Sequence, residues 1–247
     1  MSVDLLVFAL GLATSVVIGL TSIGGMLIVP GLVFVLGFDV ANAIPATMLA
    51  FLPAAVIGLV MILQMGSLDR PANTALWIGA IPGALLGALA LPYVAVGALY
   101  WLMVVIMAVS GLRALGLGPR GSGAAALPGR GELAATGFGV GIVSALTGTG
   151  GPVTLVPIMM LRGVTPAIIV PLAQAITIPI TGLASLGYWT RGSVEPRLTL
   201  VLAAGCTVGI VLGIRAKRHV PAAQVTRLIA IVLVASAALL AARLLLG

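Results

Sequence analysis

Two short segments of the chain combine glycines with hydroxyl side chains, and each connects an apolar run to a shorter apolar stretch. Their hydroxyl and glycine residues are Thr21, Ser22, Gly24 and Gly25 in the first segment and Thr147, Thr149, Gly150 and Gly151 in the second. A helix that begins at such glycines presents unpaired amide N–H groups and the positive end of its dipole, and glycine lets a ligand approach closely. Because the hydroxyls add further donors, the two segments predict a cradle for a small oxyanion.

A plainer interpretation of these segments stays open at this point. Gly-Gly pairs also serve as turns or packing sites, and Ser and Thr in helices often donate to the carbonyl four residues earlier. The occurrence of the same feature in both halves of the chain favours the anion cradle. Thr47 and Gln174 join the candidate substrate-binding residues, because each is a polar group inside an apolar run and requires a partner there.

The chain lacks the residue clusters that most enzymes and metal proteins use. Its single histidine, His219, lies among basic residues, and no cluster of His, Cys, Asp and Glu has the spacing of metal ligands. No Gly-Lys-Ser/Thr phosphate-binding sequence occurs, and no carboxylate is expected inside a membrane span. We therefore expect no enzymatic activity, no metal and no cofactor, and the absent carboxylates argue against cation transport.

The composition identifies a membrane protein. Of 247 residues, 61% are hydrophobic and only 7% are charged, and the mean hydropathy is +1.30. A soluble domain carries about 25% charged residues, so this chain could not cover its surface in water. The net charge of +7 is attributed to cytoplasmic loops. Nucleic acid is not an expected partner, because no basic run is interleaved with aromatic residues.

Apolar runs separated by polar breaks predict an all-α polytopic fold in the lipid bilayer. About 20 residues are required to cross the bilayer as a helix. The long runs are Val3–Leu20, Ala41–Gln64, Thr74–Leu91, Val94–Leu115, Leu133–Leu146, Ala167–Trp189, Leu198–Ile214 and Ala222–Leu246. Two stretches, Gly25–Leu36 and Val153–Leu161, are shorter. Aromatic residues at run ends, Trp77, Tyr188 and Trp189, are expected in the interfacial belt.

An internal duplication divides the chain into two homologous membrane repeats. Gly66-Ser67 recurs as Gly192-Ser193, 126 positions later. The same offset relates Gly79, Gly83 and Gly87 to Gly205, Gly209 and Gly213. It also relates Gly37, Pro45 and Pro53 to Gly163, Pro171 and Pro179. The rows of glycine at every fourth position predict close helix packing. We expect a first repeat over 1–115, a linker over 116–131 and a second repeat over 132–247.

The orientation of the repeats depends on whether the short stretches cross the membrane. If they do, or complete a crossing with irregular backbone near the midplane, each repeat has five spans and the second is inverted. If they only dip in and return as re-entrant segments, each repeat has four spans and the two are parallel. Both arrangements occur in transporter folds.

The basic residues discriminate between these arrangements, because cytoplasmic loops carry an excess of Lys and Arg. With the N-terminus outside, the inverted five-plus-five arrangement puts nine of the twelve basic residues on the inner side. The best four-plus-four arrangement puts seven inside and five outside. Arg162 is inside and Arg191 outside in the first arrangement, and the reverse holds in the second. We favour five plus five.

At these residues the sequence resembles the sulfite exporter TauE/SafE family, also called the 4-toluene sulfonate uptake permease family. The similar features are the glycine-rich stretches followed by Pro30 and Pro157, and the links Gly66-Ser67-Leu68-Asp69 and Gly192-Ser193-Val194-Glu195. The resemblance covers nearly the whole chain and implies a multi-pass protein of the bacterial inner membrane. It also implies transport of sulfite, sulfonates and related sulfur oxyanions, often outward.

The leading functional prediction is a secondary transporter of small sulfur-containing anions that exports sulfite or an organosulfonate by alternating access. A passive anion channel built from the same parts is the first alternative. A membrane protein with a role other than transport is the second. We expect a homodimer only because many membrane proteins form one.

Overall fold

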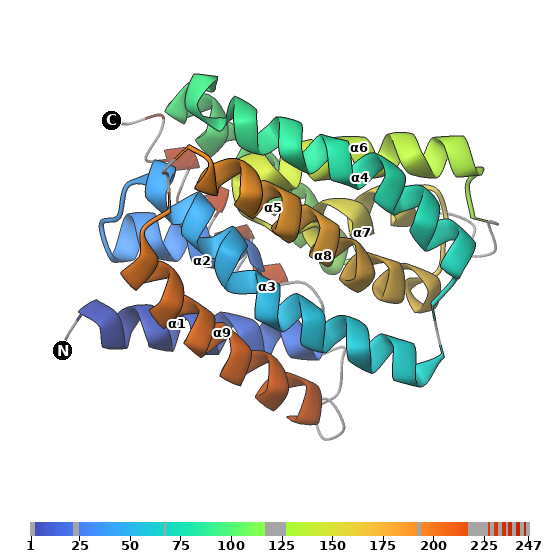
Figure 1. The fold of residues 1–247 in the computed structure, drawn as a ribbon, viewed down its shortest axis with the longest axis horizontal. Coiled ribbons are helices and arrows are strands. Elements are labelled where there is room, and N and C mark those ends of the chain that lie inside the picture. The colour runs from blue at the N-terminus through green and yellow to red at the C-terminus, as the bar shows by residue number, and fades with distance from the viewer. Residues whose placement is uncertain are drawn as a thin grey trace.

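The computed structural model describes residues 3–21, 25–66, 68–116, 127–191 and 194–216, together with ten residues between 227 and 245. Over these residues the regular secondary structure is entirely helical, as Figure 1 shows. The predicted all-α fold is therefore confirmed. The central part of the predicted linker, 117–126, and most of the last predicted span lie outside the described residues.

Seven long helices form the body of the protein. They are α1 (Val3–Thr21), α3 (Val40–Met65), α4 (Arg70–Ala90), α5 (Val96–Ala114), α6 (Arg130–Thr147), α8 (Pro166–Trp189) and α9 (Pro196–Ala216). Among the described residues, the helices long and apolar enough to cross a membrane cover Val3–Leu20, Val40–Gln64, Arg70–Tyr93, Ile168–Trp189 and Pro196–Ala216. These five spans agree with the predicted runs, and the chain is a multi-spanning membrane protein.

The two short stretches are short helices, as predicted, but they differ in regularity. In the second half, α7 (Pro152–Leu161) is a single α-helix. In the first half, a 3-10 turn, η1 (Gly25–Leu27), leads into one α-turn, α2 (Ile28–Pro30), and then into a π-helix, η2 (Gly31–Val35). The wide π-turn follows Pro30, whose ring lacks the amide donor of a regular ladder. A second 3-10 turn, η3 (Leu91–Tyr93), follows α4.

Acidic residues at the membrane edges cap helix starts. Asp39 accepts a hydrogen bond from the amide of Ala41 at the start of α3, at 3.0 Å. Asp69 accepts one from the amide of Ala72 at the start of α4, also at 3.0 Å. Each carboxylate accepts a hydrogen bond from an amide that has no partner within the helix, and its negative charge lies at the positive end of the helix dipole. These two carboxylates therefore have structural roles.

The glycine rows form two seams in which helix backbones touch. On α4, a Cβ at Gly79, Gly83 or Gly87 would overlap backbone oxygens of α6. On α9, a Cβ at Gly205, Gly209 or Gly213 would overlap backbone oxygens of α1. The partner helices add glycines of their own, Gly137 and Gly141 on α6 and Gly11 and Gly19 on α1. The predicted packing role of these rows is confirmed.

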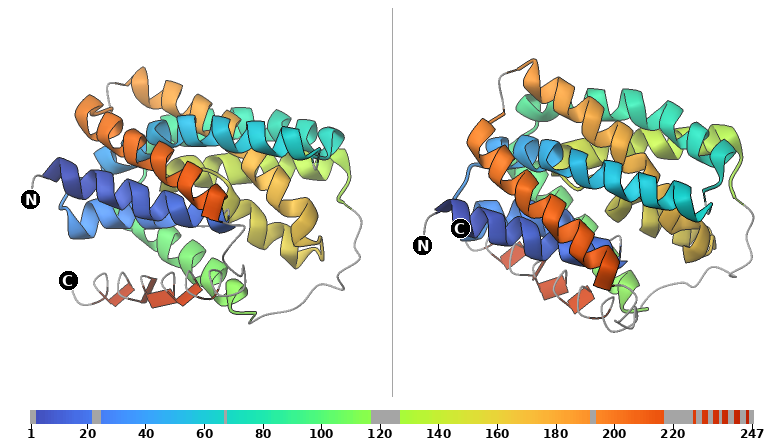
Figure 2. Two further views of the ribbon diagram at one scale, coloured as in Figure 1. Left: turned by 90° about the horizontal axis from the view of Figure 1, so that it is seen from below. Right: turned by 60° about the horizontal axis from the view of Figure 1, so that its bottom comes forward.

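Each seam joins a helix of the first predicted repeat to a helix of the second. Helices α1 and α9 lie side by side in Figure 1 and in both views of Figure 2, and α4 and α6 form the other tightly packed pair. Helices α3 and α8 lie between these pairs and contact one or both of them. The repeats are therefore interlocked.

Contacts at the two ends of the bundle favour the five-plus-five arrangement. Arg162, after α7, pairs with Glu132 in the first turn of α6. The guanidinium of Arg191, after α8, lies 5.3 Å from the ring centre of Tyr93, at the end of η3. The four-plus-four arrangement would put the members of each pair on opposite sides of the membrane. In Figure 1, α3 and α8 also run in opposite directions; the inverted repeat itself stays a prediction.

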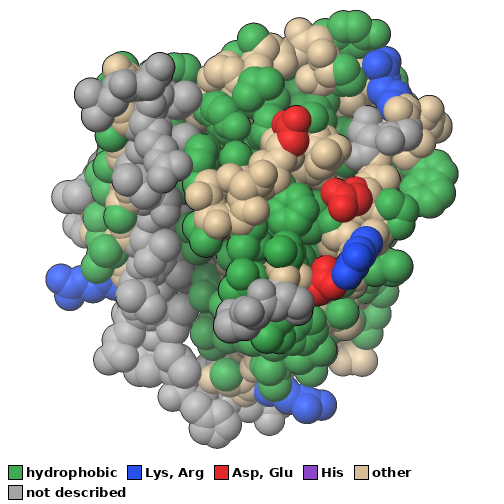
Figure 3. Space-filling view, turned by 90° about the vertical axis from the view of Figure 1, so that its left-hand side faces the viewer, with side chains coloured by type: hydrophobic (Ala, Val, Ile, Leu, Met, Phe, Trp, Pro, Cys, Tyr) green, Lys and Arg blue, Asp and Glu red, His purple; other side chains and the backbone are tan. Residues whose placement is uncertain are grey.

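The two ends carry different charge. Figure 3 looks at the end that holds Tyr93 and Arg191, where charged side chains are scattered among apolar ones. In the described part of the chain this end holds the acids Asp4, Asp39 and Glu195 and the bases Arg191 and Arg197. The opposite end holds the acids Asp69 and Glu132 and the bases Arg70, Arg113, Arg130, Arg162 and Arg215. The positive-inside rule therefore predicts that the Glu132 end is cytoplasmic.

The aromatic residues only partly follow the interfacial belt. Trp189 is 65% exposed, as expected for a belt residue. Tyr188 is 1% exposed, and its hydroxyl donates to the carbonyl of Ala145 on α6. Trp77 donates its indole N–H to the carbonyl of Ala175 on α8, at 3.1 Å. Assignment of Tyr188 to the belt is therefore wrong, because its polar tip has a protein partner and its ring is buried.

The seams predict a position-specific effect of a single methyl group. Gly137→Ala should destabilise the protein by about 1–3 kcal/mol, because its Cβ would overlap the carbonyl of Leu76 across the α4–α6 seam. Gly139→Ala, two residues away on the same helix, meets nothing within 4 Å and should be neutral or slightly stabilising. Thermal unfolding in detergent measures both, and equal midpoints would contradict the seam.

The end contacts predict which loops share a side of the membrane. Cysteines would be placed singly at 93, 132, 162 and 191 in a Cys206→Ser background, since native Cys206 is buried. A membrane-impermeant thiol reagent applied to intact cells should label positions 93 and 191 alike. Positions 132 and 162 should react only after the cells are opened. Labelling of 162 together with 93 would restore the four-plus-four arrangement.

Candidate anion-binding site

A cavity lies where the two glycine-rich segments meet, deep between the helices. It encloses about 400 Å³ of empty space, its open mouth included. The residues that line it come from α1, η1, α3, the α6–α7 loop, α7, α8 and α9, and they are Ile18, Gly25, Phe51, Ala54, Ala55, Thr149, Gly150, Pro152, Val153, Gln174, Thr177 and Ile210. Four predicted site residues are therefore brought together: Gly25, Thr149, Gly150 and Gln174.

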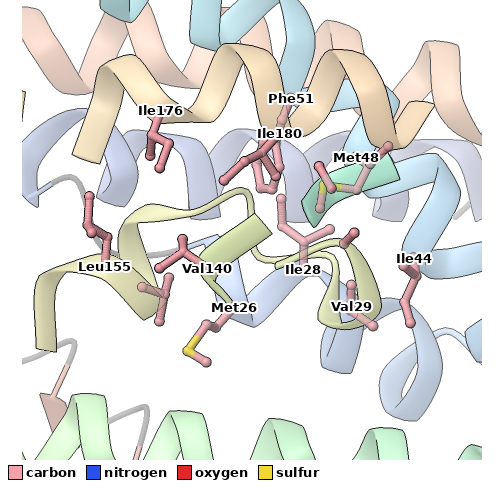
Figure 4. Close-up of a cluster of buried hydrophobic side chains, with 14 of the residues drawn as sticks. Met26, Ile28, Val29, Ile44, Met48, Phe51, Val140, Leu155, Ile176 and Ile180 are labelled. Carbon is pink, nitrogen blue, oxygen red and sulfur yellow. The ribbon is translucent and has the colours of Figure 1, made fainter. Parts of the chain in front are cut away.

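The two segments touch each other directly. A Cβ at Gly25 would lie 3.1 Å from the carbonyl oxygen of Thr149 and 3.0 Å from the ring of Phe51. On the other side, a Cβ at Gly150 would lie 3.4 Å from the same ring. Figure 4 shows the apolar side chains around this junction, with Phe51 and Ile180 close together above the segments. Only glycine permits so close an approach of the two backbones.

The α6–α7 loop leaves backbone donors free at the start of α7. The amide of Thr149 donates to the carbonyl of Ser144 at 3.2 Å, and the amide of Leu155 donates within the first turn of α7. Between them lie amides that find no acceptor among the described residues, and these belong to Gly150, Gly151 and Val153. Gly150 and Gly151 have φ angles of +75° and +112°, which L side chains rarely adopt. The glycines are thus required for a loop that exposes amides.

The threonine hydroxyls of this segment are used within the protein. Thr147 donates to the carbonyl of Val143 at 2.7 Å. The hydroxyls of Thr147 and Thr149 lie 3.1 Å apart, so Thr149 supplies the hydrogen between them. In this conformation neither hydroxyl hydrogen points at a ligand. Their role as ligand donors stays a prediction, and the loop amides are the donors that remain.

The other predicted residues differ in their relation to the cavity. Thr47 is buried, donates to the carbonyl of Ala43 at 2.7 Å and does not line the cavity. Gly151 faces α8, where its Cβ would meet Ile176 and Ile180. Thr21 is the last residue of α1, and nothing is described of its side chain. Ser22 and Gly24 lie outside the described residues.

Among the lining residues that the sequence analysis did not predict, Phe51 and Thr177 matter most for the chemistry of the cavity. Phe51 on α3 contacts both glycine segments, and an apolar residue inside an apolar run carries no signal of that contact. Thr177 on α8 lies one turn beyond Gln174, so helical spacing alone could have found it. The repeat offset of 126 places these two at matching positions. The cavity therefore has an aromatic wall from α3 and a polar wall from α8.

Unlike the threonine hydroxyls, the side chain of Gln174 makes no hydrogen bond to its own helix. Its carbonyl oxygen reaches toward α3, 3.5 Å from the position of a Cβ at Gly58. No hydrogen bond joins its side chain to another described residue, whereas Thr177 donates to the carbonyl of Ala173 at 3.1 Å. The amide group of Gln174 is therefore available to a ligand in the cavity.

None of the described residues that line the cavity is charged. The positive potential there comes from the free loop amides and from the start of α7, whose dipole points its positive end at the junction. Such a site suits an anion, and it attracts less strongly than a lysine or arginine would. A bundle of apolar helices in which two short helical segments meet at a buried, uncharged cavity has the architecture of a membrane transporter.

Residues 7–240 match the family model described as sulfite exporter TauE/SafE. The chain therefore belongs to this family of integral membrane transporters, as its glycine and proline pattern indicated. No curated protein and no solved structure matched the chain. The family supports a transport function and a non-enzymatic role in general terms.

The loop glycines predict two separable effects of a Cβ. Gly150→Ala and Gly37→Ala both force alanine to a φ of +75°, so each should lose about 1–2 kcal/mol of stability. Gly37 meets nothing within 4 Å, whereas the new Cβ at Gly150 narrows the cavity against Phe51. Only Gly150→Ala should lose the rise in melting temperature that sulfite causes. Equal responses of both variants to sulfite would remove Gly150 from the site.

Proposed function

We propose that this protein is a secondary transporter that exports small sulfur-containing anions, sulfite or an organosulfonate, by alternating access. The observation that carries this proposal is the set of amides at Gly150, Gly151 and Val153 that lack an acceptor among the described residues, in the glycine-rich loop and first turn of α7 that border the cavity. A buried amide without an acceptor is unfavourable in lipid, and an anionic ligand would supply that acceptor.

The chemistry of the cavity favours oxyanions over cations. Its available donors are the loop amides and the Gln174 side chain, and none of the described residues that line it is a carboxylate. A sulfur oxyanion offers several acceptor oxygens to such donors, while the apolar wall at Phe51 tolerates the substituent of a sulfonate. Binding without a full countercharge is weak, and a carrier must release its substrate on the other side.

Export follows the membrane potential. With the Glu132 end cytoplasmic and the inside negative, outward movement of a monovalent anion is favoured by about 2.3 kcal/mol per 100 mV. The anion's own gradient or a coupled ion would add to this term. The basic residues at the Glu132 end would raise the local anion concentration at the entrance.

The packing indicates what moves during alternating access. The α1–α9 and α4–α6 seams bring backbones into contact, so each pair is expected to move as a rigid unit. Helices α3 and α8 lie between the pairs and carry the cavity walls. A rocking motion of one pair against the other would open the cavity to one side at a time.

A panel of anions tests the substrate class. Sulfite, thiosulfate or sulfoacetate should raise the melting temperature of the purified protein, because a ligand of the folded state stabilises it by about 2.7 kcal/mol at a concentration of 100 times Kd. Chloride at the same ionic strength is the control. A response to chloride that equals the response to every sulfur anion would contradict the proposal.

Counterflow in proteoliposomes tests the carrier mechanism. Unlabelled sulfite inside the vesicles should accelerate uptake of labelled sulfite, because a carrier returns faster when loaded. A passive channel would conduct the anion without this acceleration. That outcome would keep the substrate and replace alternating access by the channel.

A further inference from the structure

A row of hydroxyl side chains leads away from the cavity along α8. Thr177, Thr181 and Ser185 follow one another at four-residue spacing and so share one face of the helix. Thr177 lines the cavity, and Ser185 lies near the Arg191 end of the bundle. Their exposed fractions are 8%, 0% and 4%. At the matching positions of α3 the side chains are apolar, namely Phe51, Ala55 and Leu59, so the row is not a requirement of the repeated fold.

Ser144 on α6 lies beside the same route. Its carbonyl accepts the amide of Thr149, which lines the cavity. The next carbonyl along α6, that of Ala145, accepts the hydroxyl of Tyr188 from α8. Ser144 is therefore placed between the cavity and Tyr188, and Ser185 lies one turn before Tyr188.

Two of these hydroxyls have no hydrogen-bond partner among the described residues. Ser144 is fully buried and Ser185 is 4% exposed, yet neither Oγ is paired. Serine and threonine in helices ordinarily donate to the preceding turn, as Thr181 does to the carbonyl of Thr177 at 2.8 Å. An unpaired hydroxyl in a dry interior is unfavourable. These two groups therefore point to a state of the protein in which water or a ligand reaches them.

We propose that Thr177, Thr181 and Ser185 on α8, together with Ser144 on α6, form the second half of the anion path, from the cavity to the Arg191 end. This proposal rests on the proposed transport function. In the present conformation the path is closed, because the Tyr188–Ala145 hydrogen bond holds α6 and α8 together. When these helices part, the hydroxyls offer successive donors to an oxyanion and to its water.

Thiol accessibility tests the path without assuming a substrate. In a Cys206→Ser background, Ser185→Cys is compared with Ala46→Cys, a fully buried residue of α3 near the same end of the bundle. A small membrane-impermeant methanethiosulfonate is added from the side on which Tyr93→Cys reacts. The cysteine at 185 should react about tenfold faster than that at 46. Equal rates would overturn the path.

Transport by hydroxyl-free variants tests the same row. The double variant Thr181→Val/Ser185→Ala removes two donors beyond the cavity, and sulfite exchange should fall about tenfold while the sulfite-induced melting shift stays unchanged. Thr14→Val on α1 is the matched control, because that buried hydroxyl also donates to the preceding turn, at 2.6 Å to Leu10. Normal exchange by the double variant would overturn the path.

The two arms separate this proposal from the transport proposal. Absence of any sulfite shift and exchange in the parent protein would remove the proposed substrate, and the labelling rates would still decide the path. The labelling arm also decides it if the double variant fails to fold.

Discussion

The structure depends on one constraint of its surroundings, that a backbone donor or acceptor without a partner is costly in lipid. Most amides meet this constraint inside long helices, and aspartates pair those at the starts of α3 and α4. The α6–α7 loop departs from this pattern, because the amides of Gly150, Gly151 and Val153 lack acceptors within the described residues. A functional site is expected where a fold tolerates such an unfavourable feature. The cavity lies at this loop, and the anion preference proposed for it rests on donors that the backbone supplies.

Much of the fold could be predicted from the sequence, because its signals are local. Apolar length marks the spans, and glycine at every fourth position marks the faces that approach closely. These signals do not identify the helix that packs against each face. The pairing of α1 with α9 and of α4 with α6 across the repeats was therefore known only from the structure. The π-helix of Gly31–Val35 was likewise not predicted, since nothing in its local sequence distinguishes a π-turn from an α-turn. The site was predictable where glycine and polar residues interrupt apolar runs, as at Gly150 and Gln174. Phe51 and the buried hydroxyl of Tyr188 were missed, because an aromatic residue in an apolar run can belong to the hydrophobic core, the interfacial belt or a binding site, and the sequence does not distinguish these.

The two halves have diverged at the cavity while they keep their scaffold in common. The seams use glycines at matching positions, whereas Phe51 and Thr177 present different chemistry at one matching position. A cavity with both an aromatic and a polar lining would suit a ligand with one apolar and one oxygen-rich end, in keeping with the proposed substrates. The same divergence leaves hydroxyls along α8 and none at the corresponding positions of α3. The second predicted repeat therefore supplies much of the polar lining of the cavity, and the first supplies its aromatic wall.

The pairing of α1 with α9 also bears on how the protein is made. Between Thr21 and Pro196 lie 174 residues that the ribosome must add before the partner of α1 begins to emerge. At synthesis rates of about 5–20 residues per second, the first helix would wait roughly ten to thirty seconds with its glycine face uncovered. During that interval lipids or the insertion machinery must shield the face. The α1–α9 seam can therefore form only late in synthesis, and release from the translocon before α9 is inserted would leave α1 without its partner.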